Sequence, residues 1–274
     1  MSQSLSIGAA PRYVRLRFAN LSGLRRFVSP VMLVLLWEGL SRAGVISPRT
    51  IAAPSAILAS AWGLTVTGEL PFNLLVSLLR VMAGFAIGTV AGIVLASVAG
   101  LSRLGEDVVD APMQMLRTLP FLALVPLFIL WFGIGELPKV ALVTLGAIFP
   151  VYLNLFAGIR GVDPKLIEAA RIFGLSGAAL VWRVVLPGAL PSLLVGLRYA
   201  LGVSWLSLVV AEQINATAGI GHLINDARDF LRTDIIVVGL LVYALLGLGA
   251  DSAVRWLERR ALRWRPTVVQ GAQR

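Results

Sequence analysis

The chain has 274 residues, of which 58% are hydrophobic and 14% are charged, and its formal net charge is +10 at pH 7. Soluble domains contain about 25% charged residues, so this chain has too little polar surface for a water-soluble globule and is expected to be an integral membrane protein. The arginines flank apolar runs and form no basic stripe interleaved with aromatic residues, so no nucleic-acid partner is expected. Without cysteine, and with His222 as the lone histidine, no disulfide or metal site is expected.

Six stretches are apolar over roughly the 20 residues that a bilayer core requires of a helix. The sequence therefore predicts an all-α membrane bundle of about six transmembrane helices. The first stretch follows a basic start, as a signal peptide does, but its apolar core runs into Trp37 and Glu38 without a small-x-small cleavage site, which favours a retained helix. The expected spans are Phe27–Ile46, Phe72–Leu101, Met113–Phe132, Val140–Ile159, Gly188–Ala211 and Ile235–Leu257.

Arginine and lysine alternate in density along the chain. The N-terminal segment, the 159–187 loop and the C-terminal tail are rich in them, and the intervening loops are poorer. By the positive-inside rule, both termini and the 159–187 loop are expected to face the cytoplasm. The chain then divides into a basic cytoplasmic segment (1–26), a first span with its periplasmic connection (27–71), a helical core (72–257) and a basic cytoplasmic tail (258–274).

The second span contains Gly84, Gly88 and Gly92, a small-residue ridge along which another helix can approach closely. Glu38 is the clearest carboxylate inside a span, and the sequence offers it no obvious partner. A charge inside the membrane is by default a functional candidate, but a charge near a helix end can instead extend to the interface. No role is therefore assigned to the three arginines within or near spans, Arg80, Arg117 and Arg198.

The 159–187 loop has helix signals at both ends of a short segment. Asp163 suits an N-cap and Pro164 the first helical position, which predicts a helix of about ten residues ending at Phe173. Gly174 then suits the left-handed residue that terminates a helix. Ser176 can cap a second short helix, which is expected to stop at Leu186-Pro187.

One side of the first loop helix carries Leu166, Ala170 and Phe173, and the small Ala169 leaves room for a partner to approach the backbone. These features suit a helix that docks in a groove of another protein. They suit equally well an amphipathic connector lying on lipid, and the residues alone leave the two interpretations open.

The spacing of the loop residues matches the EAA loop of binding-protein-dependent importer permeases, with valine in place of the usual isoleucine. The residues that carry this match are Glu168, Ala169, Ala170, Gly174, Val184, Leu186 and Pro187. The resemblance covers roughly residues 70–265. Leu130–Gly135 and Leu186–Ser192 look like the nitrate/sulfonate/taurine branch, and Asn225–Leu231 most resembles its aliphatic-sulfonate permeases.

This resemblance implies the permease fold of a type I ABC importer in the bacterial inner membrane. It implies a homodimer whose EAA loops (163–187) each dock into one of two copies of a separate ATP-binding subunit, which uses the ATP and Mg. A periplasmic solute-binding protein would deliver the solute to an outer face that includes residues 212–233. A separate ATP-binding subunit is consistent with the absence of a Gly-x-x-x-x-Gly-Lys-Ser/Thr phosphate-binding loop from this chain. That loop needs glycine directly before lysine, and the only lysines, Lys139 and Lys165, both follow proline. The chain is therefore expected to be no enzyme and to hold no cofactor.

The expected function is import of aliphatic sulfonates. Taurine, nitrate or another small organic anion is the alternative solute, and a stand-alone secondary transporter is a more distant alternative. A secondary transporter usually shows intramembrane carboxylates for ion coupling or a repeat of broken helices. The residues that bind substrate are not predicted.

Overall fold

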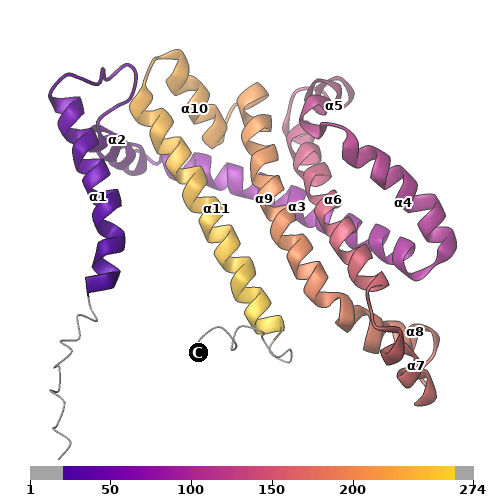
Figure 1. Ribbon diagram of the computed structural model, residues 1–274. Coiled ribbons are helices and arrows are strands. Elements are labelled where there is room, and N and C mark those ends of the chain that lie inside the picture. Colours follow the sequence, from indigo (N-terminus) through magenta and orange to yellow (C-terminus); the bar gives the residue numbers. More distant parts are fainter. Residues whose placement is uncertain (1–20, 263–274) are drawn as a thin grey trace, which may run out of the picture.

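The computed structural model describes residues 21–262, which contain helices and no strand (Figure 1). The all-α expectation is confirmed. The helices are α1 (Leu21–Arg42), α2 (Pro54–Val66), α3 (Glu69–Leu101), α4 (Arg103–Thr118), the 3-10 helix η1 (Phe121–Leu124), α5 (Val125–Phe132), α6 (Glu136–Arg160), α7 (Pro164–Ile172), α8 (Gly177–Leu180), the π-helical turn η2 (Val181–Val185), α9 (Leu186–Asn215), α10 (Ile220–Asp229) and α11 (Thr233–Ala261).

Four helical runs of the described chain are long and apolar enough to cross a bilayer. They are α3, α6, the continuous run Gly177–Ile214 that contains α9, and α11. Each contains one predicted span, and together they confirm a multi-pass membrane protein. The first predicted span corresponds to α1, a 22-residue helix that ends at Arg42 and is not among these four.

The predicted span Met113–Phe132 is wrong as a single helix. Helix α4 ends at Thr118, and the chain continues through Leu119, in an extended conformation with φ −71° and ψ 135°, into η1 and α5. Pro120 explains this break, because the residue before a proline is pushed out of the helical region. The span is predicted from its apolar composition alone. That composition does not depend on the position of Pro120, so it gives no sign of the break.

The glycine ridge of α3 packs against α6, as predicted. A Cβ atom on Gly84 would come within 2.6 Å of Val143 Cβ, and one on Gly88 within 2.5 Å of the Thr144 carbonyl oxygen. Real Cβ atoms do not approach other atoms this closely. The absence of side chains at these positions therefore sets the separation of α3 and α6.

Glu38 has partners, contrary to the expectation from sequence. Its carboxylate accepts hydrogen bonds from Arg42 Nε at 2.6 Å and from the Ser55 backbone N–H and hydroxyl at 3.0 and 2.8 Å. Ser55 lies 17 residues away, in the first turn of α2, so the chain must fold back before the pair can form. Glu38 therefore ties the end of α1 to the beginning of α2.

Candidate functional site

The first helix of the 159–187 loop forms as predicted. Pro164 opens α7, and the Asp163 carboxylate accepts a hydrogen bond from the Lys165 backbone N–H at 2.9 Å. Gly174 follows the helix with φ +83°, and its N–H donates to the Arg171 carbonyl at 2.9 Å, while the Leu175 N–H donates to the Ala170 carbonyl at 3.0 Å. This pair of bonds is the Schellman motif, which closes a helix at a left-handed glycine.

The second loop helix differs from the prediction. Ser176 occupies the N-cap position of α8 in an extended conformation, but its side chain makes no capping hydrogen bond. The helix does not stop at Leu186-Pro187, because the Leu186 N–H donates to the Val181 carbonyl five residues earlier and the chain continues into α9. The π-helical turn relieves the clash that Pro187 would otherwise make with the preceding turn, so the loop is mechanically continuous with α9.

Burial divides the predicted coupling residues into two groups. Ala170 is buried against its own chain, so it is not part of a free face with Leu166 and Phe173. The large exposed apolar side chains at the end of α7 are Ile172 and Phe173, which are 84% and 85% exposed. Glu168, Ala169, Gly174 and Pro187 are exposed, and Val184 and Leu186 are half-buried. Ile172 was missed because it lies outside the EAA spacing.

A second arrangement, not predicted from sequence, surrounds Arg80 on α3. Its Nη1 donates to Glu212 Oε1 at 2.7 Å and to the Ala218 carbonyl at 2.6 Å. Its Nη2 donates to Glu136 Oε1 at 2.6 Å, and its Nε to the other oxygen of Glu136. Lys139 Nζ lies 3.2 Å from Glu136 Oε1, so two cations face two carboxylates. Each of the three buried charges, Arg80, Lys139 and Glu212, is therefore paired, while Glu136 is 58% exposed.

Glu212 is fully buried and accepts hydrogen bonds from three further groups. These are the Ser77 hydroxyl at 2.8 Å, the Gly221 N–H at 2.9 Å and the Tyr243 hydroxyl at 3.0 Å. The Ser77 hydroxyl oxygen also accepts the Ile220 N–H at 2.9 Å. The cluster therefore fixes the start of α10 against α3, α9 and α11.

Gly219 shows how tightly this cluster packs. Its φ is +114°, and a Cβ atom there would lie 2.6 Å from Arg80 Nη1 and 2.7 Å from the Glu212 carboxyl carbon. Its N–H donates to Asn73 Oδ1 at 2.7 Å. Sequence reasoning singled out Arg80 but missed this arrangement, because its partners lie far away in the chain.

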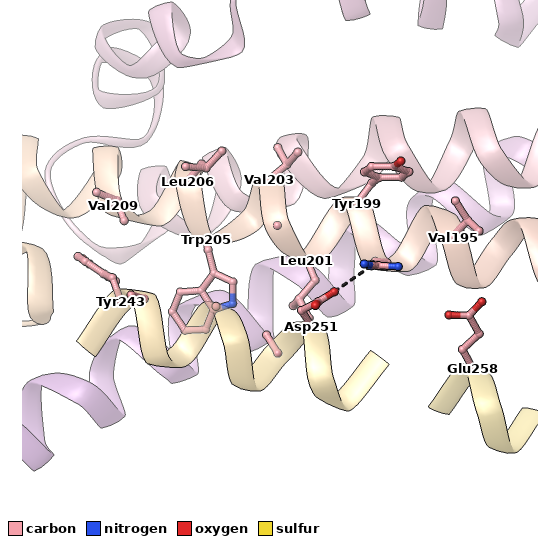
Figure 2. Close-up of a pocket in the computed structure, with 15 residues that line it drawn as sticks. Val195, Tyr199, Leu201, Val203, Trp205, Leu206, Val209, Tyr243, Asp251 and Glu258 are labelled. Atoms are coloured by element: carbon pink, nitrogen blue, oxygen red, sulfur yellow. Dashed lines mark hydrogen bonds and ion pairs between the residues drawn. The ribbon is translucent and has the colours of Figure 1, made fainter. Parts of the chain in front are cut away.

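The two other arginines occupy different environments. Arg117 is exposed in the last turn of α4, a helix end. Arg198 on α9 pairs through Nε with Asp251 Oδ1 of α11 at 2.8 Å, and Arg255 Nη1 lies 2.6 Å from Asp251 Oδ2. This pair lines a cavity of about 830 Å³ between α9 and α11 (Figure 2).

A family model described as "binding-protein-dependent transport system inner membrane component" matches residues 88–263. The chain is 49% identical over 237 residues to a protein of Escherichia coli (strain K12) named as aliphatic sulfonates transport permease SsuC, covering 86% of this chain and 90% of that one. It is 42% identical over 251 residues to the protein of the same name in Bacillus subtilis (strain 168), covering 92% and 90%.

The fold is also found among solved structures. The crystal structure of an amino acid ABC transporter with histidines matches with a TM-score of 0.57 and 21% identity, covering 72% of this chain and 97% of that one. The family match spans more than half of the chain and includes the whole α7–α9 loop and α11. The chain therefore belongs to the family of binding-protein-dependent transport system inner membrane components, and is an ABC importer permease.

Proposed function

We propose that this chain carries aliphatic sulfonates across the inner membrane, driven by a separate ATPase that docks on α7. The observation that carries this proposal is the coincidence of the EAA spacing with a rigid, exposed helix end. The Schellman motif at Gly174 holds Ile172 and Phe173 outward, where an apolar groove on another protein can receive them. The choice of aliphatic sulfonates as the solute rests on the names of the two SsuC relatives.

The loop is well placed to transmit force because it joins two tightly packed helices. α6 and α9 lie so close that a Cβ atom on Gly158 would come within 2.6 Å of Ser192 Cβ, and one on Gly196 within 2.9 Å of Asn154 Cβ. Close-packed helices move together, because their interface has no room to deform. Displacement of α7 by the ATPase would therefore move α6 and α9 as a unit.

The remaining parts of the proposal concern the assembly. Two copies of this chain pair with two ATP-binding subunits, which hydrolyse the ATP with Mg, and a periplasmic binding protein supplies the solute to the outer side. Both termini face the cytoplasm, as the distribution of arginine predicts. The seven EAA-loop residues, Glu168 to Pro187, couple the chain to the ATPase.

Reconstitution tests this proposal. The permease, its ATPase and its binding protein are placed in proteoliposomes, and ATP-dependent uptake of radiolabelled ethanesulfonate, taurine and nitrate is measured. We expect uptake of the sulfonate to be fastest and to vanish when the ATPase is omitted. Uptake of nitrate alone would reassign the solute, and uptake without the ATPase would indicate a secondary transporter.

A further inference from the structure

The cavity between α9 and α11 combines an apolar wall with a cationic group. Its apolar side includes Leu201, Leu206 and Val209, and its polar side includes Arg198 and Asp251 (Figure 2). The residues from Arg198 to Val209 span eleven helical steps, or roughly 16 Å at 1.5 Å per residue. An elongated molecule with one polar end would match this distribution.

Trp205 supplies an independent sign that the cavity takes a ligand. Its side chain lines the cavity, the residue is only 8% exposed, and its indole Nε1 has no hydrogen-bond partner within residues 21–262. A buried donor without an acceptor is costly, and such groups in native proteins usually have a partner. Figure 2 shows the indole nitrogen on the side of the ring that faces Asp251.

Arg198 also has donors to spare. Its ion pair with Asp251 uses Nε, and no other hydrogen bond of this guanidinium occurs among the residues that the structure describes. A guanidinium has five N–H donors arranged in a fork, which suits the oxygens of a tetrahedral or planar anion. Arg198 and Trp205 are seven residues apart, two helical turns, and therefore share one face of α9.

The two carboxylates that line the cavity are arranged so that an anion can still bind. Asp251 is balanced by both Arg198 and Arg255. Glu258 lies seven residues beyond Asp251 on α11, two turns further toward the end of the helix, and Figure 2 shows it well apart from Trp205. Arg198 and Arg255 therefore outweigh the single charge of Asp251, which leaves the Arg198 end of the cavity able to hold an anion.

We propose that this cavity is a binding site for an alkanesulfonate within the permease. The sulfonate oxygens accept hydrogen bonds from the free nitrogens of Arg198 and, once the indole turns so that its buried Nε1 reaches the cavity, from Trp205. The alkyl chain lies against Leu201, Leu206 and Val209. The site rests on the proposed sulfonate import, and gives the permease its own selection of solute in addition to that of the binding protein.

Direct binding tests the site in the permease–ATPase complex without the binding protein. Radiolabelled pentanesulfonate should bind saturably to the wild-type complex. Arg198→Gln and Trp205→Phe should each weaken binding at least tenfold, since a hydrogen bond to a charged group contributes at least that much. Arg103→Gln and Trp62→Phe, exposed residues outside the cavity, should bind as wild type. Arg198→Lys should bind between wild type and Arg198→Gln.

Asp251→Asn separates anion binding from a purely structural role of the ion pair. If Arg198 serves only to hold α11 through Asp251, Asp251→Asn should impair the complex as much as Arg198→Gln does. If Arg198 binds the sulfonate, Asp251→Asn should preserve or tighten pentanesulfonate binding, because it removes a competing acceptor. Weakened binding in both variants, with normal binding in Trp205→Phe, would overturn the proposal.

ATP-driven uptake with the binding protein present distinguishes failure of the cavity proposal from failure of the proposed function. Normal sulfonate uptake by wild type, Arg198→Gln and Trp205→Phe alike would reject the cavity and leave the proposed function standing. No sulfonate uptake by the wild-type transporter would reject both. An anionic phospholipid that is retained by the wild type, lost from Arg198→Gln and not displaced by pentanesulfonate would make the cavity a lipid site, and would also overturn the proposal.

Discussion

Arg80 and Glu212 form an ion pair, with Nη1 and Oε1 2.7 Å apart, at a point where the two side chains are 5% and 0% exposed. They come from α3 and α9, which are 132 residues apart in the chain at this pair. The pair also holds the start of α10, through the Ala218 carbonyl just before the helix and the Gly221 N–H in its first turn. This one buried pair thus joins α3, the first helix of the core, to α9 and α10, which lie near its end.

Breaking this pair should be strongly destabilising. Glu212→Gln leaves Arg80 with one carboxylate partner instead of two, and loss of one member of a buried pair costs about 3–5 kcal/mol. Arg80→Gln should cost a similar amount, and the double variant should cost less than the sum of the two. Thermal unfolding of the purified permease in detergent measures this. Arg228→Gln is the control, because its pair with Asp229 is about 70% exposed and should contribute little. Additive costs would show that the two residues do not interact.

Gly219→Ala should also lower the unfolding temperature. The added methyl group would collide with Arg80 and Glu212, and the backbone at φ +114° is strained for any residue with a Cβ. Gly249→Ala is the matched control, since its added methyl meets no atom within 4 Å and it lies inside α11. The control should be neutral or stabilised by up to about 1 kcal/mol, through the higher helix propensity of alanine. Equal unfolding temperatures for both variants would refute the tight packing around Gly219.

The features that sequence predicted correctly are local ones. Asp163, Pro164 and Gly174 carry the signals for α7 within twelve residues, and the glycines of α3 carry their own packing signal four residues apart. The charge cluster could not be predicted in this way, because Arg80, Glu136 and Glu212 meet only after the helices have packed. The break at Leu119 is not predicted for another reason. The span is assigned from its apolar content, and that criterion takes no account of Pro120.

The orientation in the membrane can be tested with single cysteines, because the chain has none of its own. Cysteines at Gly68, Leu137 and Asp226 should react with an impermeant maleimide added outside intact cells, and one at Leu175 should react only after the membrane is opened. The reason is the asymmetry of arginine between the loops. Labelling of Asp226→Cys only in opened cells would reverse this assignment.

Gly174→Asp should separate membrane insertion from coupling. The left-handed conformation costs a residue with a Cβ about 1–2 kcal/mol, and no atom lies within 4 Å of the added group, so the fold should persist. A charge at the surface proposed to meet the ATPase should nevertheless abolish stimulation of ATP hydrolysis by loaded binding protein. Glu168→Ala should have a smaller effect, because one exposed charge contributes little.

Ala178→Asp is the control for the Gly174 experiment. It places the same charge on α8, at an exposed helical position outside the EAA spacing. We expect ATPase stimulation close to wild type in this variant. Equal loss of stimulation in both variants would show a general sensitivity of the loop to charge, and normal stimulation in Gly174→Asp would remove the coupling role of α7.

The most direct measurement of the central claim is cross-linking of Phe173 to the ATPase. In a Phe173→Cys chain, a short bifunctional reagent should join the permease to the ATP-binding subunit, because this exposed side chain is proposed to lie in its groove. Trp62→Cys on α2 is 72% exposed and should give no such product. A permease–ATPase adduct at 173 alone is the predicted result. Active transporter that yields no adduct at 173 would contradict the account.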